Sequence, residues 1–167
     1  MKIAFIDFDG PLFNDKSLAL PENTQPHLNK APKIGLHPFY NYWKIHSIEK
    51  DMLLSLIGRG YFFVITSSWS NPAMHTKEQI QQIFVENDIP LVFHRDWTLA
   101  HNKKLRSQQI IDWLENHPEI EEYIVLDDPQ SGEGLVVAKE QGTLKNVYLC
   151  DPDLGFTQDE IQKIISN

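Results

Sequence analysis

Cysteine is almost absent from this chain of 167 residues, in which Cys150 is the only one. A single cysteine cannot form an internal disulfide, so the composition fits a reducing compartment. Long hydrophobic runs are also missing: no stretch approaches the roughly 20 apolar residues that a transmembrane helix needs. The acidic residue Asp7 follows so soon after the start that the sequence does not fit a signal peptide. We therefore expect a cytoplasmic protein without a membrane segment.

Basic residues are scarce as well. Lysine and arginine together number 15, against 23 aspartates and glutamates, which gives a formal net charge of −8. This balance argues against an extended basic groove for nucleic acid, although not against an enzyme that handles a polynucleotide end locally. The seven histidines show no zinc-ligand spacing, so the sequence predicts no histidine metal site. Internal repeats are absent, and the length predicts one domain over residues 1–167.

Short apolar runs alternate with segments of helical periodicity. The predicted strands are Lys2–Ile6, Tyr61–Ile65, Pro90–Phe93, Tyr123–Leu126 and Val147–Leu149. The predicted helices begin at Ser47, Thr76, Lys104 and after the capping-box residue Thr157. Strands that alternate with helices are typical of a three-layer α/β/α, Rossmann-like fold, here with a central parallel sheet of about five strands.

Residues 13–46 interrupt this pattern with recurrent prolines and an aromatic stretch that ends at Trp43. About 30 of these residues exceed what the fold needs, which is too few for a large cap domain. We expect an irregular loop that could act as a minimal lid. Bases could stack on its aromatic rings, but a hydrophobic cluster that covers the sheet is the simpler interpretation. The aromatic residues concerned are Phe39, Tyr40, Tyr42 and Trp43.

Polar side chains follow three of the predicted strands directly. The first strand is followed by Asp7 and Asp9, the second by Thr66 and Ser67, and the fourth by Asp127 and Asp128. Because the carboxyl ends of parallel strands meet at one edge of the sheet, these groups should converge in one crevice. Four carboxylates there would repel one another strongly, and hard oxygen ligands favour Mg²⁺ as the neutralising cation.

This combination of groups suits phosphoryl transfer. An ionised aspartate can attack phosphorus, and a second carboxylate two residues further on can protonate the leaving alcohol and then activate water. Hydroxyl and N–H groups of Thr66 and Ser67, with a nearby cation, would hold the phosphate. The candidate cations are Lys103, Lys104 and Arg106, of which Lys104 lies near the start of its predicted helix.

The ordered set Asp7-Phe8-Asp9-Gly10, Thr66-Ser67, Lys104 and Asp127-Asp128 resembles the haloacid dehalogenase (HAD) superfamily over nearly the whole chain. Several further segments are similar to the small HAD domains associated with RNA-repair proteins. The resemblance implies Asp7 as nucleophile, Asp9 as general acid and base, and Lys104 as the catalytic cation. It further implies a phosphate site made by Phe8, Thr66, Ser67 and Lys104, and a Mg²⁺ site made by Asp7, Asp9 and Asp128 with Asp127 in support.

The resulting expectation is a capless, Mg²⁺-dependent phosphomonoester hydrolase that works through an aspartyl-phosphate. Its expected substrate is a nucleic-acid terminal phosphate, and its partners are a phosphorylated small molecule or a nucleic-acid end. No membrane and no obligate protein partner are expected. Two alternatives stay open: a nucleotidase acting on free 5′- or 3′-nucleotides, and a non-catalytic phospho-acceptor or binding module.

Overall fold

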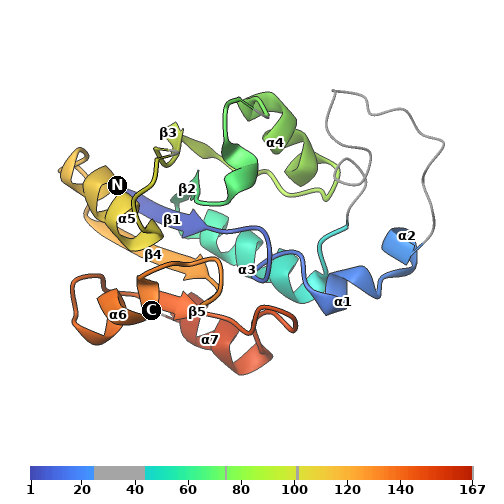
Figure 1. The fold of residues 1–167 in the computed structure, drawn as a ribbon. Helices are drawn as coiled ribbons and strands as arrows, with labels where there is room; N and C mark the ends of the chain where they lie inside the picture. Colours follow the sequence, from blue (N-terminus) through green and yellow to red (C-terminus); the bar gives the residue numbers. More distant parts are fainter. Residues whose placement is uncertain (25–43, 74, 101, 167) are drawn as a thin grey trace.

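The computed structural model describes residues 1–24, 44–73, 75–100 and 102–166. It contains a five-stranded sheet in the order β3-β2-β1-β4-β5, in which all neighbours pair in parallel (Figure 1). The strands are β1 (Lys2–Ile6), β2 (Tyr61–Ile65), β3 (Phe93–Thr98), β4 (Glu122–Asp127) and β5 (Val147–Leu149). The predicted parallel α/β sheet is therefore confirmed.

Helices cover both faces of the sheet because successive side chains of each strand point to opposite faces. In β1, Ala4 and Ile6 pack into one core, whereas Ile3 and Phe5 pack into the other. The first core receives side chains from α3 (Ser47–Gly58), α4 (Lys77–Val85) and α7 (Gln158–Ser166). The second core receives them from α5 (Arg106–Glu115) and α6 (Leu135–Glu140). This arrangement is the predicted three-layer fold.

Strand β3 begins where the sequence pattern predicts its end. The predicted strand ended at Phe93, but the observed one runs from Phe93 to Thr98. As an edge strand, β3 keeps Arg95 and Asp96 exposed, so its sequence lacks the continuous apolar run of a buried parallel strand. The crossover helix α6 also escaped prediction, because six residues carry too little periodicity.

Residues 13–46 are described only in part. Two short helices, α1 (Asp15–Leu18) and α2 (Pro21–Thr24), lie within this segment, and neither is evident from the sequence pattern. The interpretation of the aromatic stretch from Phe39 to Trp43 concerns residues outside the described ranges. Between the end of β3 and the start of α5 there are only seven residues, so no second inserted domain fits there.

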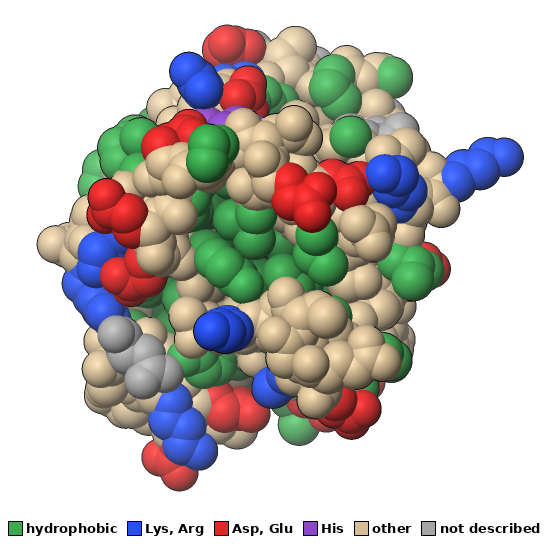
Figure 2. Space-filling view, turned by 90° about the vertical axis from the view of Figure 1, so that its left-hand side faces the viewer, with side chains coloured by type: hydrophobic (Ala, Val, Ile, Leu, Met, Phe, Trp, Pro, Cys, Tyr) green, Lys and Arg blue, Asp and Glu red, His purple; other side chains and the backbone are tan. Residues whose placement is uncertain are grey.

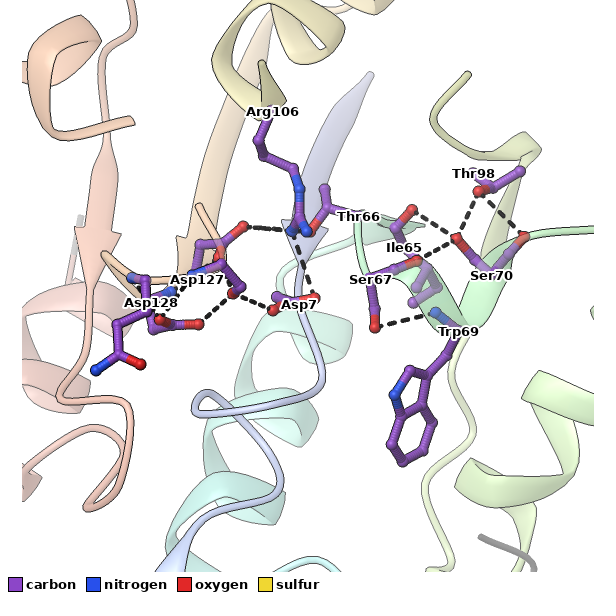
Figure 3. A network of polar contacts seen from close by, with 12 residues as sticks. Asp7, Ile65, Thr66, Ser67, Trp69, Ser70, Thr98, Arg106, Asp127 and Asp128 are labelled. Atoms are coloured by element: carbon purple, nitrogen blue, oxygen red, sulfur yellow. Dashed lines mark hydrogen bonds and ion pairs between the residues drawn. The ribbon is translucent and has the colours of Figure 1, made fainter. Parts of the chain in front are cut away.

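The two ends of the sheet differ in character. Figure 2 looks at the side of the molecule on which the strands begin, and hydrophobic side chains lie at its centre with acidic and basic ones around them. The polar residues that follow the strands lie at the opposite, carboxyl edge (Figures 1 and 3). Within the described ranges, none of the helices combines the length and the apolar character needed to cross a membrane.

Candidate active site

Buried polar residues gather where β1, β2 and β4 end. Asp7 follows β1, Thr66 follows β2, and Asp127 is the last residue of β4 (Figure 3). The backbone continues the sheet ladder at these positions, since the N–H of Asp7 donates to the carbonyl of Leu126 and that of Thr66 to the carbonyl of Ile6, both at 2.9 Å. The strands themselves therefore fix the starting positions of these side chains.

Three aspartates form the centre of the site. Ligand oxygens of Asp7, Asp127 and Asp128 all lie within 4.8 Å of one another, and all three residues are buried. The Ser131 hydroxyl connects them: it donates to Asp7 Oδ2 at 2.7 Å, lies 3.2 Å from Asp127 Oδ1 and also contacts Asp128 Oδ2. Asp128 is held in turn by the backbone N–H groups of Gln130 and Ser131, which donate to its Oδ1.

Arg106 supplies positive charge to this group. It is the first residue of α5, and its guanidinium reaches down between the ends of the strands (Figure 3). Its Nη1 donates to Asp127 Oδ2 at 2.8 Å and to the Thr66 hydroxyl at 3.0 Å, and it lies 3.4 Å from Asp7 Oδ1. One cation, whose side chain is only 13% exposed, therefore faces two of the three carboxylates.

Burial and neighbouring charge raise the pKa of two carboxyl groups here, those of Asp127 and Asp9. Burial and the neighbouring charge of Asp7 raise the pKa of Asp127, while Arg106 opposes the rise. Asp9 is exposed at the edge of the cluster, yet partial desolvation of its carboxyl group raises its pKa to about 6. The charges of Asp7 and Asp128 add to this effect, and a hydrogen bond from the Trp69 side chain opposes it.

The turn after β1 is tightly packed. Gly10 has φ +85°, and a Cβ there would come within 3.1 Å of Asp128 Cβ, so only glycine fits without strain. The Phe8 ring is fully buried between Phe13, Trp69 and Phe84. The backbone carbonyl of Phe8 accepts hydrogen bonds from the N–H groups of Leu12 and Phe13. This packing holds the loop that carries Asp7 and Asp9 in one conformation.

The side chains of two predicted site residues, Lys104 and Ser67, bond to partners outside the cluster. Lys104 Nζ pairs with Asp112 Oδ2 at 2.5 Å along the exposed side of α5, and Arg106, the alternative cation, occupies the site instead. The physical reason is that α5 begins only at Arg106: Lys104 precedes the extended N-cap residue Leu105, so its side chain does not follow the helix direction that carries Arg106 to the strand ends. The Ser67 hydroxyl accepts from the Trp69 N–H at 3.3 Å and caps the short 3-10 helix Ser68–Ser70.

Ser131 was not anticipated from the sequence. Its signal was present in the turn Asp128-Pro129-Gln130-Ser131, because an aspartate followed by proline favours a turn in which the carboxylate accepts backbone N–H groups. The observed bonds to Asp128 Oδ1 have this form. Gly132 then allows the close return of the chain, since a Cβ at this position would lie 2.6 Å from the Asp128 carbonyl.

The cluster fits a divalent cation by charge and by donor type. Its donors are carboxylate oxygens, with a hydroxyl oxygen beside them, and Arg106 offsets only one of three negative charges. A hard dication such as Mg²⁺ prefers oxygen ligands of this kind and would offset the remaining repulsion. Asp7, Asp127 and Asp128 are the side chains that could hold it.

A family model described as "HAD domain in Swiss Army Knife RNA repair proteins" matches residues 3–161 of the chain. The matched segment includes β2 to β5, all of β1 except Lys2, and every residue of the cluster. No curated protein and no solved structure matches the chain significantly. The HAD superfamily consists largely of hydrolases and phosphatases and generally uses Mg²⁺.

Proposed function

The chain belongs to the family of HAD domains in Swiss Army Knife RNA repair proteins, and from this premise we propose that it is a Mg²⁺-dependent phosphomonoester hydrolase that removes a terminal phosphate from a nucleic acid. The observation that carries the proposal is the buried group of Asp7, Asp127 and Asp128, which faces Arg106 and Thr66 at the carboxyl edge of the sheet. Such a site can bind a phosphate and supply a nucleophile to it.

In the first step of the proposed reaction, an Asp7 carboxylate oxygen attacks phosphorus. A new oxygen–phosphorus bond forms, the bond to the leaving oxygen breaks, and Asp9 donates its proton to that oxygen. A carboxyl group with a pKa of about 6 retains enough proton near neutral pH to serve as this acid. The products of the step are an alcohol and an aspartyl-phosphate on Asp7.

In the second step, the Asp9 carboxylate takes a proton from water while the water oxygen attacks phosphorus. The bond between Asp7 and phosphorus breaks, which releases inorganic phosphate and restores both carboxyl groups. Throughout, the guanidinium of Arg106, the Thr66 hydroxyl and the Phe8 N–H hold phosphate oxygens. Bound Mg²⁺ would neutralise phosphate charge, with Asp7, Asp128 and the Asp9 carbonyl as ligands and Asp127 in support.

The substrate is tested by phosphate release with Mg²⁺ near neutral pH. The panel contains p-nitrophenyl phosphate, 5′- and 3′-mononucleotides, and oligonucleotides phosphorylated at either end. We expect the oligonucleotide ends to be preferred and EDTA to abolish release, with excess Mg²⁺ restoring it. Preference for mononucleotides would replace the proposal by a nucleotidase, and release that survives EDTA would remove the metal from it.

The positions of Arg106 and Lys104 lead us to expect different roles for them in this proposal. Arg106→Met should lower kcat/KM for phosphate release by about 10²- to 10³-fold, since it removes a preorganised cation from the phosphate site. Lys104→Met should change kcat/KM by less than about twofold, because Lys104 Nζ is engaged by Asp112. The same steady-state assay measures both variants. Equal losses in the two would mean that Lys104 also reaches the substrate.

A further inference from the structure

A second group of potential metal ligands lies away from the aspartate cluster. It consists of His94 and Asp96 on β3 and His117 just beyond the end of α5, and one ligand atom from each lies within 4.8 Å of the others. Both histidines are buried, whereas the Asp96 side chain is 55% exposed.

His117 has the hydrogen bonding expected of a metal ligand. Its Nδ1 lies 2.6 Å from the carbonyl of Trp113, which can only accept, so Nδ1 carries a proton. Its Nε2 faces Asp96 Oδ2 at 2.9 Å. Two acceptors at that distance require a proton or a cation between them. A backbone carbonyl on the second ring nitrogen is also the usual support of a metal-bound histidine.

His94 and Asp96 complete the donor set. They are two residues apart on β3, and their ligand atoms lie within 4.8 Å of each other and of that of His117. His94 Nδ1 accepts from the Asp96 N–H at 3.1 Å, and coordination through that nitrogen would displace this one bond.

The rings are held in place before any ion arrives. Trp113 stacks on His117 with centroids 3.7 Å apart and meets the edge of His94 at 5.0 Å. Trp113 Nε1 also donates to the carbonyl of Asp96 at 3.2 Å. Ligands held in this way lose little conformational freedom on binding, which favours the binding of an ion.

We propose that His94, Asp96 and His117 bind one Zn²⁺ ion, with water as the remaining ligand. Two imidazoles and a carboxylate with an open position form a donor set that zinc accepts. The spacing within the sequence does not reveal the site, because the packing of α5 on β3 brings its two parts together. The ion would fasten the end of α5 to an edge strand, while the other end of α5 carries Arg106.

The positive charge of Arg95 beside the three ligands predicts an effect on zinc affinity that can be measured. Arg95 Nε lies 3.4 Å from Asp96 Oδ2, and Arg95 Nη2 lies 3.7 Å from Glu119 Oε1. The arginine competes with a cation for Asp96 without being a ligand itself. Arg95→Ala should therefore tighten zinc binding several-fold, an effect that nonspecific binding to surface histidines would not produce.

The test is calorimetric titration of the metal-free chain with ZnCl₂ in excess Mg²⁺, which keeps the aspartate cluster occupied. We expect one Zn²⁺ per chain and a higher Tm at saturation. His117→Gln should weaken binding at least about 100-fold and Asp96→Asn at least about 10-fold, and both should lose the rise in Tm. His75→Gln is the matched control: His75 is also buried with Nδ1 near a backbone carbonyl, and its loss should leave binding unchanged.

Absence of zinc binding in the unsubstituted chain would overturn the proposal, as would binding that survives both Asp96→Asn and His117→Gln. Circular dichroism checks that each variant is folded. Should His117→Gln fail to fold, Asp96→Asn decides the matter alone, because its half-exposed side chain can change without disturbing a core.

Discussion

Asp7→Asn is expected to abolish phosphate release, with a loss in kcat on the order of 10⁴-fold or more. The asparagine amide has nearly the shape of the carboxylate but is not a nucleophile, so no aspartyl-phosphate can form. Asp7 is buried and accepts from Ser131 at 2.7 Å, contacts that a side chain of equal size can fill. The measurement is release of inorganic phosphate under saturating substrate and Mg²⁺.

The same substitution should not lower the free energy of unfolding. The charge of Asp7 raises the pKa of both Asp9 and Asp127, which means that it repels these neighbours in the folded state. Removing that charge relieves the repulsion, and Arg106, which lies 3.4 Å from Asp7 Oδ1, keeps its closer partner Asp127 at 2.8 Å, so denaturant unfolding should show Asp7→Asn at least as stable as the original chain. Loss of activity without loss of stability is the pattern of a residue kept for its chemistry.

Two controls make the result specific. Asp153→Asn changes an exposed carboxylate outside the cluster and should leave activity unchanged. Acid-quenched chain from a reaction with labelled substrate should carry a hydroxylamine-sensitive label that Asp7→Asn lacks. Full activity in Asp7→Asn would contradict the nucleophile assignment, and a long-lived phosphoprotein formed from acetyl phosphate would favour a phospho-acceptor module instead.

The sheet and the aspartates at its edge could be predicted from the sequence for one physical reason. Buried parallel strands must be continuously apolar, so the point at which β1 gives way to Asp7 or β4 to Asp127 is visible in the residue order. Parallel pairing then places those points at one edge. The convergence of Asp7, Thr66, Asp127 and Asp128 follows from these two facts, without any information on packing.

What the sequence did not reveal depends on packing and on where elements begin. Whether Lys104 or Arg106 enters the site is decided by where α5 begins: the helix starts at Arg106, and Lys104 stays in the preceding non-helical segment. The contact of Ser131 with the carboxylates depends on the turn after Asp128. Strand β3 was placed wrongly because an edge strand lacks the apolar run of a buried strand. His94 and His117 are 23 positions apart in the chain and meet only through the packing of α5 on β3.

Asp9→Asn should slow both steps of the proposed reaction, and its effect on the first step should depend on how basic the leaving group is. Asp9 lies two residues from the nucleophile, at the exposed edge of the cluster, and a hydrogen bond from Trp69 orients its carboxyl group. A nucleotide or oligonucleotide leaves as a sugar alkoxide, a strong base that needs a proton as the bond breaks. Loss of a general acid should therefore lower kcat/KM for these substrates by about 10²- to 10⁴-fold.

p-Nitrophenolate is a much weaker base and leaves without that proton, so kcat/KM for p-nitrophenyl phosphate should fall far less in Asp9→Asn. The second step still needs a base, because water must lose a proton to attack the aspartyl-phosphate. Rapid mixing with p-nitrophenyl phosphate should consequently show a burst of p-nitrophenol followed by slow turnover. Equal losses in kcat/KM for both substrate types, with no burst, would mean that Asp9 has a structural role in the site and is neither the acid nor the base. A burst with a large loss on sugar phosphates alone would support its role as the acid and the base.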